Sequence, residues 1–322
     1  MRPPFRLRRT FGLHPVFFLL ACLALTGCAK RDAGAFVVGF SQMESDNPWR
    51  LAETKSIRDE AARLGIRLVV TDAQGQTSKQ VADVEDLIAR HVNLILLAPR
   101  EYDGLAPALQ AARAAKIPVI LVDRAAAGTA GEDYVTLLES NQVEQGVRAA
   151  EWLARETKGV ANIVELSGTP GASVAADRAR GFREGIAKYP GMKIAASQSG
   201  NFSRATGQGV MQNIAQSLGK QITAVFAHND EMALGAVQAL IASGLRPGTD
   251  VRIISIDGER AALEAIDRGE LGATVESNPR FGPLAFAAIE KFRRGEAVPA
   301  RILIQDRFFD RSNARQFIAD AY

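Results

Sequence analysis

Polar residues that can form several hydrogen bonds stand directly after four apolar segments of the chain. The segments and the residues that follow them are 119–122 before Asp123 and Arg124, 224–228 before Asn229, 251–256 before Asp257, and 273–275 before Glu276. Carboxylate, amide and guanidinium groups can each bridge two neighbouring hydroxyl groups, and charged partners form the stronger hydrogen bonds. These residue types suit a small ligand with many hydroxyl groups, such as a sugar.

The same residue types also cap helices, because their side-chain oxygens accept hydrogen bonds from the first turn. This structural interpretation stays open for each position taken singly. Four such positions in one chain, with Trp49 available to pack against the apolar C–H face of a sugar, favour a binding site instead.

The elements that position these residues follow from the alternation of apolar runs with helical patterns. Strands are expected at 36–40, 66–70, 94–97, 118–122, 162–166, 193–196, 224–227 and 251–256. Helices are expected at 48–64, 78–91, 104–115, 143–156, 173–188, 203–218 and 231–242, and a loop at 125–133. Near-continuous apolar strands separated by helices are typical of parallel sheets covered on both faces.

This alternation is too long for one sheet of ordinary width, so two sheets are expected. In parallel α/β sheets the ligand binds beyond the carboxyl ends of the strands. The polar residues that end the strands should therefore point into one gap between two lobes.

The N-terminus carries the marks of a targeting segment. Four arginines precede an apolar stretch at residues 16–25, which is too short to span a bilayer. The stretch ends in Leu25-Thr26-Gly27-Cys28, which resembles a bacterial lipobox. Residues 1–28 are thus predicted to be a signal peptide with Cys28 as the lipidated residue. The alternative is an ordinary signal peptide in which this cysteine is incidental.

Removing this leader reverses the charge of the chain. The full sequence has 39 basic and 36 acidic residues, and without the four leader arginines the balance is 35 minus 36, or −1. The basic character is mostly a leader effect, so nucleic-acid binding is not expected. The only cysteines are Cys22 and Cys28, so the mature chain has no disulfide to form.

Catalytic and metal chemistry find little support in the sequence. Only three histidines are present, His14, His91 and His228, and they cannot build a His-Cys metal cluster. The motifs typical of α/β-hydrolases, P-loop proteins and dinucleotide-binding proteins are absent. His228 is interpreted as a packed residue at the end of a strand. No metal and no cofactor are expected.

Several short motifs resemble a known family when they are read in order. They are Val38-Gly-Phe-Ser-Gln42, Trp49-Arg-Leu-Ala-Glu53, Asp123-Arg124, Glu165-Leu-Ser-Gly-Thr169, Gly171-Ala-Ser-Val174, Asp177-Arg178, Gly181-Phe182, Ala227-His-Asn-Asp230 and Ser255-Ile-Asp-Gly258. The chain resembles the ribose/galactose-type periplasmic sugar-binding proteins, and most of all the galactofuranose-binding members that serve ABC importers. The resemblance covers nearly the whole chain after the leader.

The resemblance implies a type I periplasmic binding protein, an α/β fold with two Rossmann-like lobes and parallel sheets joined by a three-crossover hinge. Residues 36–137 plus 277–305 would form the N-terminal lobe, and 138–276 plus 306–322 the C-terminal lobe. Trp49 would be the stacking platform and Arg50 a hydroxyl donor, with Asp46 nearby. The remaining sugar-binding residues implied are Asp123 and Arg124 from the first lobe, Arg178, Asn229 and Asp257 from the second, and Glu276 at a crossover.

These expectations describe a monomeric, non-catalytic receptor in the periplasm that touches a membrane only through a lipid anchor on Cys28. It would capture a monosaccharide and deliver it to the permease and ATPase of an ABC transporter. Galactofuranose is the first candidate, with ribose, arabinose and galactopyranose as alternatives. Two other roles stay open: a sensor that presents the bound sugar to a chemoreceptor or histidine kinase, and a sugar-acting enzyme that uses Asp257 or Glu276.

Overall fold

The structure, a computed structural model, describes residues 36–322. The predicted signal peptide, its lipobox and Cys28 lie outside the described residues. In the part of the chain that is described, no helix has the length and apolar character needed to cross a membrane.

The first lobe is built on a six-stranded sheet in which every neighbouring pair is parallel. Its strand order is β11 (Arg301–Leu303), β5 (Thr136–Glu139), β4 (Val119–Val122), β3 (Leu94–Leu97), β1 (Val37–Gln42) and β2 (Arg67–Asp72). The central strands β3 and β4 are buried at every residue, which agrees with their continuous apolar sequences.

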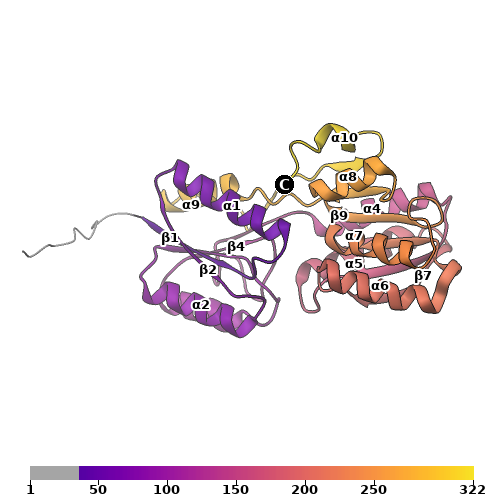
Figure 1. The fold of residues 1–322 in the computed structure, drawn as a ribbon. Coiled ribbons are helices and arrows are strands. Elements are labelled where there is room, and N and C mark those ends of the chain that lie inside the picture. The colour runs from indigo at the N-terminus through magenta and orange to yellow at the C-terminus, as the bar shows by residue number, and fades with distance from the viewer. Residues whose placement is uncertain (1–35) are drawn as a thin grey trace, which may run out of the picture. The chain divides into compact units, whose positions relative to one another are not determined.

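Helices cover both faces of this sheet, as Figure 1 shows for α1 and α9 on one side and α2 on the other. The helices of this lobe are α1 (Pro48–Arg63), α2 (Thr77–Ala89), α3 (Ala106–Ala114) and α9 (Gly282–Arg293). Successive strand residues face opposite sides. Leu94 and Leu96 therefore pack with α1 and α9, while Ile95 and Leu97 pack with α2 and α3.

The second lobe repeats this architecture with one antiparallel edge strand. Its strand order is β12 (Phe308–Asp310), β10 (Ala273–Glu276), β9 (Arg252–Asp257), β8 (Ala224–Ala227), β6 (Val160–Ser167) and β7 (Gly191–Ser199), and only the β10–β12 pair is antiparallel. Its helices are α4 (Gln142–Glu156), α5 (Ser173–Ile186), α6 (Arg204–Leu218), η1 (Gly219–Gln221), α7 (Asp230–Ala242), α8 (Arg260–Arg268) and α10 (Ala314–Phe317). The predicted α/β fold with two mostly parallel sheets is confirmed.

Close packing of α4 on α5 depends on glycines in both helices. A Cβ at Gly181 would lie 1.9 Å from the carbonyl oxygen of Val143, and one at Gly146 would lie 2.3 Å from the carbonyl oxygen of Arg178. Only glycine allows the two backbones to approach this closely. This contact sets the position of α5, which carries Arg178.

The chain passes between the sheets three times. The first crossing (residues 140–141) follows β5, the second (277–281) follows β10, and the third (304–307) joins β11 to β12. Because β5 reaches Glu139, the first crossing begins after that residue, whereas the sequence placed the lobe boundary after residue 137. The short strands β5, β11 and β12 were not among the predicted strands.

Candidate functional site

A pocket lies between the two lobes, at the carboxyl ends of both sheets. The empty space in it, including open solvent at its mouth, is about 300 Å³. The first lobe contributes Asn47, Trp49, Arg50, Asp123 and Arg124 to its lining, and the second contributes Val174, Arg178, Phe202, Asn229 and Asp257. Side chains that end separate strands in two sheets thus meet at one place, as the sequence predicted.

Most of the predicted site residues line this pocket, but two of them lie elsewhere. Asp46 is exposed and lines a neighbouring hollow with Asn201 and Glu231. Glu276 ends β10 beside the second crossing, and its carboxylate accepts hydrogen bonds from Arg307 Nε at 2.9 Å and Nη2 at 2.6 Å. The structure therefore places Asp46 and Glu276 outside the pocket lining.

Arg50 and two carboxylates form a buried ionic cluster on the first-lobe side. Arg50 Nη2 lies 2.6 Å from Asp123 Oδ2, and Nη1 lies 2.9 Å from Glu53 Oε2. Burial by itself lowers the pKa of Arg50, but Asp123 and Glu53 outweigh this effect and raise it. Burial also raises the pKa of Glu53, against the opposing charge of Arg50. The guanidinium is thus held charged and oriented at the pocket wall.

Arg124 brings a second guanidinium to the same side. Burial, and next the neighbouring charge of Arg50, lower the pKa of Arg124 to about 10. Its Nη1 donates to the carbonyl of Arg100 at 3.1 Å. Its buried Nε makes no hydrogen bond among the described residues and has only a long ion-pair contact of 3.5 Å to Asp123 Oδ2. A buried donor without a partner is costly, so a ligand oxygen that accepts from Nε would stabilise the site.

Arg178 and Asp257 form the second-lobe side. Arg178 Nη1 donates to the carbonyl of His228 at 2.6 Å and Nη2 lies 3.5 Å from Asp257 Oδ1. Burial raises the pKa of Asp257 well above its ordinary value; Arg178 opposes this shift, while Asp230 and Asp123 add to it. This carboxyl group is consequently loosely paired and can accept or donate hydrogen bonds to hydroxyl groups.

Both pocket carboxylates belong to residues with a positive φ. Asp123 has φ 68° and Asp257 has φ 138°, and each lies at the end of a buried strand. Residues other than glycine rarely adopt positive φ, and such strain costs about 1–3 kcal/mol per residue. This backbone strain occurs in both lobes, at the residue whose carboxylate lines the pocket.

Two aromatic rings reach the pocket from opposite lobes. Trp49 is 6% exposed, and its Nε1 donates to the carbonyl of Ser277 at 2.7 Å. Phe202 also lies in the left-handed region, with φ 58°, and its ring has the guanidinium carbons of Arg124 and Arg178 at 5.2 and 6.0 Å. Sequence reasoning selected Trp49 but missed Phe202, Asn47 and Val174.

Asn229 both caps a helix and lines the pocket. Its Oδ1 caps α7 by accepting from Met232 N at 3.0 Å, and its Nδ2 donates to the carbonyl of Phe202 at 3.1 Å. The preceding His228 is fully buried, as predicted, and its Nε2 lies 3.2 Å from Glu165 Oε1. The capping role thus fixes Asn229 in the pocket lining, and the two roles do not exclude each other.

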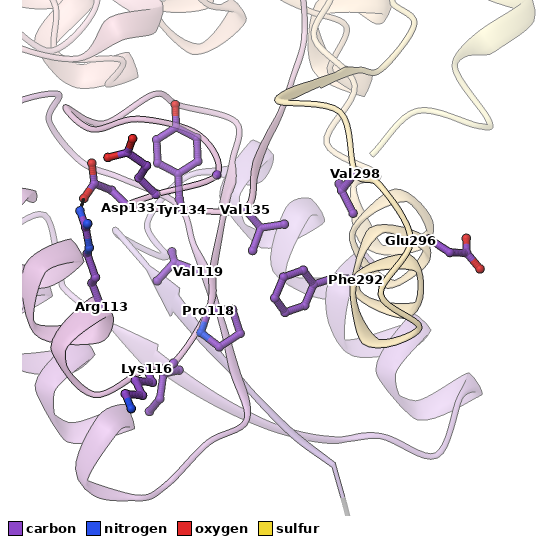
Figure 2. A pocket seen from close by; sticks show the side chains of 13 residues that line it. Arg113, Lys116, Pro118, Val119, Asp133, Tyr134, Val135, Phe292, Glu296 and Val298 are labelled. Carbon is purple, nitrogen blue, oxygen red and sulfur yellow. Dashed lines mark hydrogen bonds and ion pairs between the residues drawn. The ribbon is translucent and has the colours of Figure 1, made fainter.

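A second hollow lies in the first lobe, at the amino ends of β4 and β5, and its lining is of a different kind. Figure 2 shows its apolar floor, which includes Val119, Phe292 and Val298, and the ion pair of Arg113 with Asp133 at its rim. These two charged side chains are 56% and 23% exposed, so the hollow has none of the buried ionic cluster of the pocket between the lobes. Among the described residues, no group of His, Cys, Asp or Glu side chains could hold a metal ion.

Comparison with known proteins agrees with this geometry. A family model described as a periplasmic binding protein domain matches residues 38–293. The galactofuranose-binding protein YtfQ of Escherichia coli (strain K12) is 40% identical over 275 residues, which cover 84% of this chain and 86% of that protein. A crystal structure of a galactofuranose-binding protein has a TM-score of 0.87 at 38% identity, over 89% of this chain and 98% of that one. The binding protein of an arabinose ABC transporter from Shewanella sp. ANA-3, solved with α- and β-L-arabinofuranose, has a TM-score of 0.85 at 39% identity, over 88% and 95% of the two chains.

Proposed function

Since the chain belongs to the periplasmic binding protein family, we propose that it captures a monosaccharide in its furanose form, with galactofuranose as the first candidate, and delivers it to an ABC importer. Its relatives are sugar-binding proteins, and the chain is a binding protein and not an enzyme. The observation that carries the proposal is the pocket itself, in which three guanidinium groups, two carboxyl groups and two amides converge from both lobes.

The chemistry of this lining supports a sugar. Vicinal hydroxyl groups can bridge the two nitrogens of a guanidinium or the two oxygens of a carboxylate, and such charge-assisted hydrogen bonds are the stronger ones. The buried Nε of Arg124 offers one donor for this purpose. Trp49 and Phe202 present aromatic faces on which the C–H groups of a sugar ring can pack. We assign sugar contacts to the lining residues, without Asp46 and Glu276.

The furanose preference rests on the relatives. Two of the solved structures that match over most of this chain are a galactofuranose-binding protein and a protein solved with arabinofuranose. Fold alone does not select a ligand, because one architecture serves many solutes. The selection must come from the ten side chains that line the pocket.

Delivery to a transporter needs two conformations that the importer can distinguish. A ligand that contacts both lobes favours the state in which the lobes approach each other, since only differential interactions shift such an equilibrium. The permease and ATPase recognise this liganded state in our proposal. A sensor would present the same state to a receptor, so transport must be tested in cells.

The experiment is calorimetric titration of the mature protein with D-galactose, L-arabinose and D-ribose, whose solutions contain furanose forms, followed by Trp49→Ala and Phe202→Ala. We expect D-galactose to bind and each substitution to weaken binding at least about tenfold, which corresponds to about 1.4 kcal/mol. Phe292→Ala is the matched control, because Phe292 belongs to the hollow in Figure 2. Absence of heat with all three sugars, or equal loss in the control, would contradict the proposal. Loss of D-galactose uptake in a deletion strain tests delivery.

We extend the proposal to a lipid anchor on Cys28, supported by Leu25-Thr26-Gly27-Cys28 in the sequence. A lipidated receptor partitions into the membrane fraction, whereas the Cys28→Ser variant does not. Mass spectrometry of the mature N-terminus checks this: an unmodified Cys28, or a mature chain that begins elsewhere, contradicts the anchor and leaves the sugar site unaffected.

A further inference from the structure

The side chain of Asp306 connects all three crossings between the lobes. Asp306 lies on the third crossing, and its Oδ1 accepts from Ser140 Oγ on the first crossing at 3.0 Å. The same oxygen accepts from the backbone N–H of Asn278 on the second crossing at 3.1 Å. One carboxylate therefore joins three chain segments that are distant in sequence.

The other oxygen of this carboxylate leads toward the pocket. Asp306 Oδ2 accepts from Gln145 Nε2 at 2.8 Å, and Gln145 Oε1 accepts from Arg178 Nε at 3.0 Å. Gln145 Nε2 also donates, over a longer distance of 3.3 Å, to the backbone carbonyl of Glu276. Guanidinium groups only donate and carboxylates only accept, so a single orientation of the Gln145 amide satisfies both neighbours. Gln145 is 1% exposed, which leaves it no solvent to replace either partner.

Arg178 is consequently held on two sides by groups outside the pocket. Gln145 fixes its Nε, and the carbonyl of His228 accepts from its Nη1 at 2.6 Å. Only Nη2, which lies 3.5 Å from Asp257, faces a pocket-lining partner. The direction of this last nitrogen depends on Gln145, and through Gln145 on Asp306.

The first lobe has its own attachment to the crossings. Trp49 lines the pocket, and its Nε1 donates to the carbonyl of Ser277 on the second crossing at 2.7 Å. A pocket residue from each lobe is thus bonded to crossing segments, Trp49 directly and Arg178 through Gln145. Asp306 then ties the crossings to one another.

We propose that Gln145 and Asp306 are positioning residues for ligand binding: they orient Arg178 and make its position depend on the geometry of the three crossings. The expected effect on binding rests on the proposed function, since Arg178 is there proposed to contact the sugar. The hydrogen bonds that lead from Asp306 through Gln145 to Arg178, which we call the relay, include no ligand atom and can be tested without a ligand.

An exchange of chemical groups provides the sharpest test. Gln145→Glu sets two carboxylates against each other. Asp306→Asn leaves its new N–H group facing another donor, either Gln145 Nε2 or the backbone N–H of Asn278. The double variant restores one donor and one acceptor, because the carboxylate introduced at position 145 would accept from both Arg178 and the amide introduced at position 306. We expect each single variant to weaken D-galactose binding about tenfold, and the double variant to recover most of the loss.

The control separates this relay from general loosening of the hinge. Arg307→Gln removes the ion pair with Glu276, which joins the third crossing to the end of β10 and does not line the pocket. We expect Arg307→Gln to lower the melting temperature and leave the D-galactose affinity unchanged. Equal loss of affinity in Arg307→Gln and Asp306→Asn, or additive losses in the double variant, would overturn the proposal.

A ligand-free measurement distinguishes failure of this inference from failure of the proposed function. In ¹⁵N NMR spectra the Nε–H of Arg178 should exchange slowly with water in the native protein. It should exchange faster in each single variant, because repulsion at position 306 displaces the side chain at position 145 from Arg178, and slowly again in the double variant. If D-galactose does not bind but this pattern holds, the sugar assignment fails and the relay stands. If exchange is the same in all variants, the relay is wrong.

Discussion

Replacing Asp123 by Asn tests whether buried charge organises the first-lobe side of the pocket. The carboxylate lies 2.6 Å from Arg50, and the two side chains are 5% and 4% exposed. Asn keeps the shape of Asp and tolerates positive φ, so the substitution removes mainly the charge. Loss of one partner of a buried pair costs about 3–5 kcal/mol. We expect about 3 kcal/mol, because Glu53 still neutralises Arg50 at 2.9 Å.

Asp133→Asn is the matched control for this prediction. Asp133 also pairs with an arginine, Arg113, at 2.9 Å, but the two side chains are 23% and 56% exposed (Figure 2). An exposed pair contributes about 0–1 kcal/mol. Both variants are unfolded by guanidinium chloride and by heat without sugar, and about 3 kcal/mol should lower the melting temperature of the Asp123 variant by roughly 5 °C. Equal destabilisation by the two substitutions would refute the argument from burial.

Two further predictions concern pH and packing. The raised pKa of Asp257 contributes stability that is complete below its unfolded pKa of about 4 and is lost as the pH rises through the folded value. The ligand-free protein should therefore unfold at lower denaturant concentration at pH 8 than at pH 5, and Asp257→Asn should flatten this slope; an unchanged slope contradicts the assignment. Gly181→Ala forces a Cβ to within 1.9 Å of a backbone oxygen and should cost about 1–3 kcal/mol. Gly209→Ala on α6, where nothing lies within 4 Å, should instead stabilise by about 0.5–1 kcal/mol, and thermal unfolding of both variants checks this contrast.

The sequence was most informative where a buried strand ends in a polar residue. Residues 119–122 are apolar without interruption, and the strand they form delivers Asp123 and Arg124 to the pocket. The same reasoning placed Asn229 and Asp257 correctly beside it. It works because the parallel sheet aligns the carboxyl ends of its strands, so that the order of elements alone determines which residues converge.

The same pattern did not reveal the ion pair of Glu276 with Arg307, because this partner is distant in sequence. Glu276 follows an apolar strand just as Asp257 does. However, β10 pairs with the antiparallel strand β12, and the chain that enters β12 brings Arg307 against this carboxylate. β12 has only three residues, too few for a periodic signal. Sequence reasoning had no means of finding the ion pair.

Phe202 was missed because the sequence pattern selected polar residues that follow strands, whereas Phe202 is an aromatic residue that precedes a helix. It stands one residue before Ser203, the N-cap of α6, where an apolar residue usually packs against the fourth residue of the helix. Here that fourth residue is Gly207, which has no side chain to offer. An aromatic residue in this position without a partner on its own helix was the available signal, and it points to a contact elsewhere.

The two sides of the pocket differ in how far their charges are already satisfied. Arg50 has short contacts of 2.6 and 2.9 Å to Asp123 and Glu53, whereas Arg178 reaches Asp257 only at 3.5 Å. A hydroxyl group can insert between the second pair at lower cost, since it displaces a weaker interaction. We therefore expect the first lobe to offer a site that is organised in advance, and the second lobe to gain hydrogen bonds when a sugar binds. Because only interactions that differ between states shift an equilibrium, we predict that contacts of the sugar with Arg178 and Asp257 favour the liganded conformation.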